Sequence, residues 1–172
     1  MRTLAILLSP LLWIACAQQH TTTETATSPS PVVDPPVQQE TVLGGPGPGD
    51  SLVISLQRTP CFGRCKAYMI NVYRSGYATF DGRSNVELEG LHQGRIGLDT
   101  LRLLLAEAER NGFYQLNDVY DRNVTDLPSA VLRLVGNGKD KRVVGRAGTP
   151  EAFTRFFEKA ETLLYPVPWR PV

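Results

Sequence analysis

Residues 66–80 read KAYMINVYRSGYATF and decide the fold, because they form two extended runs on either side of a turn signal. In the first run Tyr68, Ile70 and Val72 fall on one face, while the residues between them fall on the other. Ser75-Gly76 is typical of a tight turn, and the residues after it resume a strand pattern. This stretch therefore predicts two antiparallel strands joined by a hairpin turn.

Four further segments show β-branched or alternating patterns that are typical of strands. They are residues 52–56, 86–89, 129–135 and 141–145. Asp81-Gly82 predicts a turn that leads into the second of these segments. Gly136-Asn137-Gly138 predicts the turn of a second hairpin, which joins the last two.

Two helices follow from apolar residues that recur at spacings of three and four. The first is predicted to begin at Asp99, as N-cap, and to stop at Asn111-Gly112. The second has a strong start at Thr149-Pro150-Glu151, with a cap, a proline in the first position and an acid in the first turn, and Pro166 ends it. The element order is then ββββ-α-ββ-α. It predicts an α+β domain in which two α-helices pack on one face of an antiparallel sheet.

The composition is that of a folded protein. Of the 172 residues 42% are hydrophobic and 20% are charged, which is too apolar for a chain that is disordered throughout. The formal net charge of +1 gives no global imbalance that would point to nucleic acid. No apolar run is long enough for a protein with several membrane spans.

The first residues have the features of a processing signal. Arg2 supplies a positive start, and residues 3–15 form an apolar run that contains Pro10 and is too short for a membrane span. The run ends in Trp13-Ile14-Ala15-Cys16, which resembles the lipobox of bacterial lipoproteins although Trp13 stands where Leu is usual. That resemblance implies cleavage after residues 1–15 and a lipid on Cys16. The alternative is an ordinary signal peptide that leaves a soluble periplasmic protein.

Residues 16–50 predict a disordered tether. They are rich in Pro, Thr and Gly and carry almost no large apolar side chain, so they cannot bury enough surface to offset the entropy of ordering. As a coil the tether would span roughly 30–35 Å. Residues 51–172 form the domain and hold 17 of the 18 basic and 13 of the 17 acidic side chains, a net charge of +4. Because Ala17, not Asp, follows Cys16, we expect an outer-membrane lipoprotein that faces the periplasm.

Cys61 and Cys65 lie between the first two predicted strands, where Pro60 and Gly63 disfavour a helix. Outside the cytoplasm an even pair of cysteines favours a disulfide that shapes the turn. A redox-active pair is the sharper alternative, but such chemistry usually uses two cysteines separated by two residues at a helix N-terminus. Metal binding would need two more soft ligands.

The segment RTPCFGRC at residues 58–65, with Tyr68 and the turn at Gly76, is similar to the start of the DUF6438 family. Further similar features are Asn111-Gly112-Phe113, the segment TDLPS at residues 125–129, and the late Trp169. The resemblance covers nearly all of residues 51–172, and Lys66 departs from it where relatives often have Pro. It implies a small envelope-associated domain without an assigned activity. Four residues near these motifs form a candidate functional loop: Arg58, Phe62, Gly63 and Asp126.

The remaining candidate sites are weaker. Four polar residues in one loop could bind Ca²⁺ but lack the ligand spacing of a calcium loop: Asp118, Asp121, Asn123 and Asp126. His92 lies between two glycines and is expected to be an exposed loop residue rather than a catalytic base. Four basic residues lie in one predicted hairpin: Lys139, Lys141, Arg142 and Arg146. We expect this basic hairpin to be a solvated surface, and the functional alternative is attraction to anionic lipid or polymer.

Together these features predict a lipid-anchored envelope domain that binds or scaffolds something and that uses no cofactor or metal. Its expected partners are the membrane, through the anchor, and an envelope protein or an anionic envelope polymer, but no nucleic acid. The alternative is a thiol–disulfide redox protein that uses Cys61 and Cys65. A hydrolase of envelope material is a third hypothesis.

We expect the double substitution Cys61→Ala and Cys65→Ala to loosen the turn between the first two strands without unfolding the domain. A bridge across so short a loop removes little chain entropy, so the expected loss is about 1–3 kcal/mol in the free energy of unfolding. Denaturant titration followed by far-UV circular dichroism measures this loss, and reduced wild-type protein should behave like the variant. A double variant that is wholly unfolded in native buffer would contradict this prediction.

Overall fold

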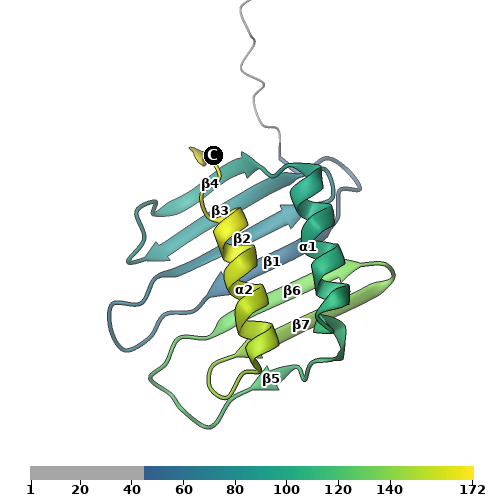
Figure 1. Cartoon of the computed structure of the whole chain (residues 1–172). Coiled ribbons are helices and arrows are strands. Elements are labelled where there is room, and N and C mark those ends of the chain that lie inside the picture. Colours follow the sequence, from purple (N-terminus) through teal and green to yellow (C-terminus); the bar gives the residue numbers. More distant parts are fainter. Residues whose placement is uncertain (1–44) are drawn as a thin grey trace, which may run out of the picture. The chain divides into compact units, whose positions relative to one another are not determined.

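The structure, a computed structural model, describes residues 45–172. The predicted signal peptide, Cys16 and nearly all of the predicted tether lie outside the described residues. The described part contains one sheet of eight strands, in the order β5-β7-β6-β1-β2-β3-β4-β8, and the helices that pack on it (Figure 1). The strands are β1 (Leu52–Arg58), β2 (Ala67–Tyr73), β3 (Tyr77–Ser84), β4 (Gly90–Arg95), β5 (Val119–Tyr120), β6 (Ala130–Gly136), β7 (Lys139–Gly145) and β8 (Arg170–Pro171). The helices are α1 (Leu98–Arg110), the short 3-10 helix η1 (Phe113–Gln115) and α2 (Glu151–Leu164).

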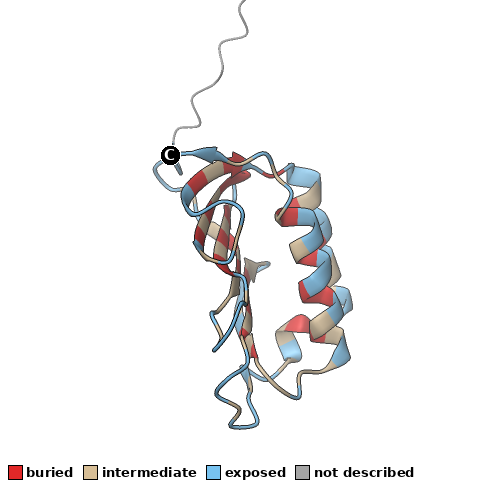
Figure 2. Cartoon of the chain, turned by 90° about the vertical axis from the view of Figure 1, so that its left-hand side faces the viewer, coloured by how far each residue is buried: buried red, intermediate tan, exposed pale blue. Residues whose placement is uncertain are grey.

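Strand β1 lies near the middle of the sheet and sets the register on both sides. Leu56 of β1 lies opposite Ile70 of β2 and Leu132 of β6, and all three side chains are fully buried. Because side chains alternate along a strand, this row belongs to one face of the sheet. Both helices lie against that face, and within residues 45–172 no helix covers the other face (Figure 2).

The core forms between this sheet face and one side of each helix. From α1 it receives Leu101, Leu104 and Ala108, and from α2 it receives chiefly phenylalanines. Phe153, Phe156 and Phe157 of α2 are at most 2% exposed. Burial of such a side chain contributes about 1.5–3 kcal/mol, so α2 is a principal source of stability.

The structure confirms the predicted α+β class and the order of the main elements. Both predicted hairpins form, with Gly76 at φ +82° in the first and Asn137-Gly138 at φ +51° and +72° in the second. The sheet is mixed rather than purely antiparallel, because the two-residue strand β5 runs parallel to β7. Strands β5 and β8 were not predicted, since two residues carry no alternation.

The predicted strand at residues 86–89 is wrong, and so is the turn at Asp81-Gly82. Strand β3 continues through Gly82 to Ser84, and β4 begins only at Gly90. A side chain at position 82 would collide with the carbonyl oxygen of Leu88. The glycine therefore marks a close approach of two backbones, not a turn.

The helix starts also differ from prediction by one or two residues. Helix α1 has Gly97 as N-cap without a side-chain hydrogen bond, and Asp99 lies in the first turn, where it pairs with Arg102. Helix α2 has Pro150 as N-cap, and the predicted cap Thr149 shares a hydrogen bond with the Thr154 hydroxyl. Among the described residues, no helix has the length and apolar character needed to cross a membrane.

We expect Gly82→Ala to lower the free energy of unfolding by about 1–3 kcal/mol, because the new methyl group forces the backbone near Leu88 to move. Denaturant titration measures the loss. Gly97→Ala is the matched control, since its φ of −59° suits alanine and its nearest neighbouring atom, in Thr100, would be 3.8 Å from the new methyl group. That control should be neutral or slightly stabilising. Equal stability of both variants would contradict the close approach at Gly82.

Candidate functional site

A pocket of about 520 Å³ opens beside the C-terminal half of α2, where β1 ends and β2 begins. We call it the Glu161 pocket. Glu161 and Tyr165 line it from the α2 side, and Arg58, Lys66 and Tyr68 line it from the sheet side. Thr162, two prolines and the Cys65 end of the disulfide complete its wall. The pocket is therefore a mixed surface of rings, prolines and a few charged groups.

Glu161 binds two strands at once through its carboxylate. Arg58 donates from Nε to Oε1 and from Nη2 to Oε2, both at 2.6 Å. The Tyr68 hydroxyl also donates to Oε1. A bidentate pair of this kind fixes both the distance and the orientation of its partners. The three side chains therefore lock α2 onto β1 and β2 at this end of the domain.

The ionisation of these groups follows from the network. Burial raises the pKa of Glu161, but the hydrogen bonds from Arg58 and Tyr68 outweigh burial and hold this pKa below its usual value. The hydrogen bond to Glu161 raises the pKa of Arg58. Burial, and then the hydrogen bond to Glu161, raises the pKa of Tyr68. Glu161 is thus held as a carboxylate, and Tyr68 is held as a neutral donor.

Two cations in the pocket lie against aromatic rings. The Arg58 guanidinium carbon is 4.8 Å from the centroid of the Phe157 ring, and Lys66 Nζ is 5.2 Å from that of Tyr165. Such contacts contribute about 0.5–1 kcal/mol at exposed sites. They hold positive charge next to apolar surface.

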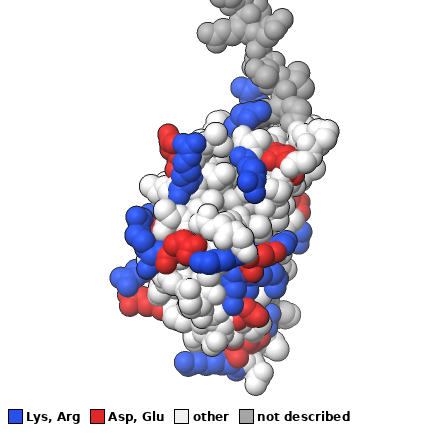
Figure 3. Space-filling view, turned by 90° about the vertical axis from the view of Figure 1, so that its right-hand side faces the viewer, with Lys and Arg blue, Asp and Glu red and all other residues white. Residues whose placement is uncertain are grey.

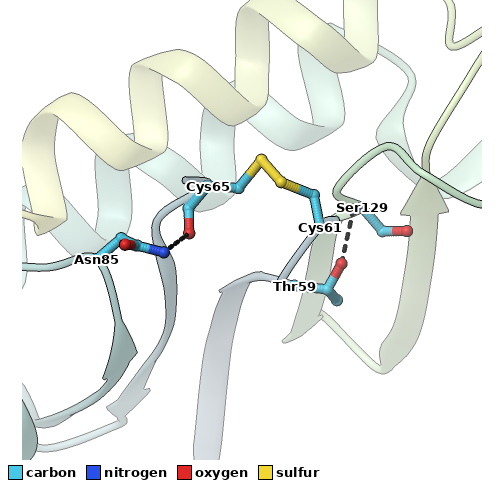
Figure 4. Close-up of a disulfide and its surroundings, with 5 residues drawn as sticks. All are labelled: Thr59, Cys61, Cys65, Asn85 and Ser129. Carbon is cyan, nitrogen blue, oxygen red and sulfur yellow. Dashed lines mark hydrogen bonds between the residues drawn. A yellow bond between two sulfur atoms is a disulfide. The ribbon is translucent and has the colours of Figure 1, made fainter. Parts of the chain in front are cut away.

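The loop between β1 and β2 closes the pocket on one side and contains the Cys61–Cys65 disulfide, whose Cα atoms are 5.7 Å apart. Figure 4 shows how both flanks of the loop are held. On one side the Ser129 amide donates to the Thr59 hydroxyl at 2.7 Å, and on the other Asn85 Nδ2 donates to the Cys65 carbonyl oxygen at 3.0 Å. Residues 59–66 are all described and contain no helix, so neither cysteine lies at a helix N-terminus, where redox-active pairs are usually found.

The structure brings only part of the predicted functional loop into the pocket. Arg58 lines it and binds Glu161, whereas Phe62 is 95% exposed beside the exposed Gly63. Asp126 is exposed, accepts a hydrogen bond from Thr125 and does not line the pocket.

Sequence reasoning missed Lys66 and Tyr68 as pocket residues, and it missed Glu161. The signal for Glu161 was present in the helix. Position 161 is four residues after the buried Phe157 and three before the buried Leu164, so helical spacing places it beside the apolar face. A carboxylate at such a position needs a partner, and Arg58 provides it.

Two of the four residues considered as a weak calcium site, Asp118 and Asp121, pair with the basic hairpin. Asp118 accepts from Lys141 at 2.5 Å, and Asp121 pairs with Arg146 at 3.3 Å. Within residues 45–172 no group of three or more His, Cys, Asp or Glu side chains could hold a metal ion.

The basic hairpin is largely neutralised as well, since Lys139 pairs with Glu109 at 2.8 Å. The side of the domain that carries this hairpin shows acidic and basic groups interleaved (Figure 3). The hairpin is therefore part of a network of ion pairs and not a cationic patch.

His92 is not the exposed loop residue that was predicted. It lies in β4, is 8% exposed, and its ring meets the Phe80 ring edge-on with centroids 6.4 Å apart. Its Nδ1 is 3.2 Å from the Gly90 carbonyl oxygen. The glycines on either side suggested a loop, but Gly94 belongs to the strand and leaves room for Val167 and Trp169.

Comparison with known families gives one match. The family model described as "Domain of unknown function (DUF6438)" matches residues 52–164, from the start of β1 to the end of α2. A search of the curated proteins found no match to the chain.

We expect Glu161→Gln to lower the free energy of unfolding by about 1–3 kcal/mol at neutral pH, because an amide cannot accept the charged bidentate pair from Arg58. Glu158→Gln is the matched control, an exposed carboxylate one turn earlier on α2, and it should change stability little. Denaturant titration measures both. Equal effects of the two substitutions would contradict a stabilising role for the network.

The lowered pKa of Glu161 also predicts how the stability difference between wild type and Glu161→Gln depends on pH. Since the folded pKa of Glu161 lies below its usual value of 4.5, its contribution is complete above that value. It is lost as the pH falls through the folded pKa, where Glu161 becomes protonated. The stability difference between wild type and Glu161→Gln should therefore shrink along a series of unfolding titrations from pH 7 to pH 2. A difference that stays constant over that series would show that the charge of Glu161 is not what stabilises the fold.

Proposed function

The chain belongs to the DUF6438 family, and we propose that it is a lipid-anchored binding module of the bacterial envelope. The Glu161 pocket is the ligand site of this module. The observation that carries the proposal is the pocket itself, whose volume of about 520 Å³ falls within the range of about 300–1,000 Å³ that is typical of small-molecule sites.

The state of the polar groups supports binding rather than catalysis. A general acid or base must be free to exchange a proton near neutral pH. Glu161 is held as a carboxylate by Arg58 and Tyr68, and the Thr162 hydroxyl donates to the carbonyl oxygen of Glu158. Glu161, Tyr68 and Thr162 are thus committed to structural hydrogen bonds, and recognition is the role that fits the pocket they line.

Anchoring rests on the sequence. The lipobox-like end at Cys16 supports lipidation and outer-membrane attachment on the periplasmic side, and residues 16–50 supply the tether. Several acyl chains at about 0.8 kcal/mol per buried methylene give a stable anchor. The module then works at a distance from the membrane that its tether sets. An envelope protein or an anionic polymer as an additional partner stays a prediction.

Ligand binding is tested with the full chain and a fragment library followed by NMR. Fragments that bind should shift signals of pocket residues in wild type, and Thr162→Trp should abolish those shifts because an exposed position on the pocket rim now carries a large ring. Arg155→Trp is the matched control, since it adds the same ring at an exposed position of α2 outside this pocket. We expect it to bind as wild type does. A library without any fragment that binds in the pocket would overturn the proposed ligand site.

The anchor is tested by growth of the producing bacterium with radiolabelled palmitate. Wild type should incorporate label and fractionate with membranes, whereas Cys16→Ser should do neither, because serine has no thiol to receive the lipid. The double variant Cys61→Ala and Cys65→Ala is the control and should retain the label. Equal labelling of wild type and Cys16→Ser would end the lipoprotein proposal.

A further inference from the structure

We infer that the ligand of the Glu161 pocket is a small amphipathic anion, a carboxylate attached to a flat apolar body. This inference rests on the proposed function and adds the chemical class of the ligand. It depends on three features of the pocket: its charge, the state of Glu161, and the rings and prolines of its wall.

The charge of the pocket favours an anion. Arg58 and Lys66 are its cations, and Glu161 is its one carboxylate among the lining residues that the structure describes. Arg58 uses Nε and Nη2 on Glu161, and its Nη1 makes no hydrogen bond with a described residue. Lys66 is exposed, and its ammonium forms no ion pair within residues 45–172. Because Arg58 and Glu161 neutralise each other, the positive charge of Lys66 is left unbalanced at the rim of the pocket.

Glu161 has little acceptor capacity left for a cationic ligand. Its two oxygens already receive three hydrogen bonds, from Arg58 and Tyr68. A ligand cation at the acceptor position that remains on Oε2 would lie close to the positive charges of Arg58 and Lys66. A ligand anion meets no such conflict, because Lys66 can donate to it without the loss of an existing hydrogen bond.

The wall of the pocket suits a flat apolar body. Tyr165 is half-buried, with its ring packed edge-on against Tyr68 at 5.1 Å between centroids, so its position is fixed by the core. Pro128 and Pro166 add rigid apolar surface, and the Cys61–Cys65 bridge limits movement of the loop at Cys65. A preformed wall of this kind binds a planar group at a low cost in entropy. Lys66 lies directly over the Tyr165 ring, so charge and apolar surface are adjacent.

The test uses three probes with one apolar body and different charges: 4-phenylbutanoate, 4-phenylbutanamide and 4-phenylbutylamine. Dissociation constants are measured with the full chain by NMR titration of signals from pocket residues. In wild type we expect the carboxylate to bind about tenfold more tightly than the amide, in line with one charge-assisted hydrogen bond. The amine should bind most weakly.

Substitutions of Lys66 then test whether its charge causes the preference for the carboxylate. Lys66→Gln should weaken the carboxylate to the level of the amide and leave the amide unchanged, while Lys66→Arg should retain the preference. Lys159→Gln is the control, because it removes the same charge from α2 outside this pocket and should leave all three constants as they are. Since Lys66 and Lys159 are both exposed, each variant should keep the wild-type circular dichroism.

The outcomes separate this inference from the proposed function. Equal binding of carboxylate and amide in the pocket, or a preference that survives Lys66→Gln, would overturn the anionic ligand and leave the binding site in place. Tightest binding of the amine would overturn it as well. If none of the three probes binds, the inference fails, and the fragment library then decides whether the site itself fails with it.

Discussion

The ion pair of Arg58 with Glu161 is the interaction on which the arrangement of this domain depends most directly. Arg58 is the last residue of β1, near the middle of the sheet, and Glu161 lies in the last turn of α2. A half-buried carboxylate is costly unless it is paired and hydrogen-bonded, so α2 must approach the sheet where Arg58 and Tyr68 can reach it. The phenylalanines of α2 supply the attraction to the sheet but little direction, because apolar burial is non-directional. The polar network fixes where the helix lies, and the pocket beside Tyr165 is a consequence of that placement.

The fold could be predicted from the sequence wherever a pattern is local and long enough. The hairpin at residues 66–80 and the apolar face of α2 each repeat their period several times, and both formed as expected. Residues 86–89 alternate equally well, yet they cross over Gly82 instead of pairing as a strand. What decides between these outcomes is a contact between Gly82 and Leu88, which no local window contains.

The candidate site was only half predictable, for the same reason. Arg58 was selected because it adjoins the cysteine motif, whereas Lys66 and Tyr68 looked like parts of a strand start. Glu161 stood among apolar residues at core spacing and could have been noticed, but its partner lies 103 residues earlier in the chain. The prediction for His92 was wrong because the glycines on either side of it were interpreted as loop residues. Both belong to β4: Gly94 leaves room for neighbouring side chains, and Gly90 adopts a positive φ. Residue types show which groups need a partner, and only the fold shows which partner they obtain.

The two edges of the sheet determine how readily copies of this domain could pair through their backbones. The strand at each edge of the sheet has only two residues: β5 forms one edge and β8 the other. The part of β7 that β5 leaves uncovered carries Lys139, Asp140, Lys141 and Arg142, and charged side chains on a short edge discourage a neighbouring strand from pairing. A sheet whose edges end in this way resists the growth of intermolecular β-structure wherever copies of the domain are concentrated.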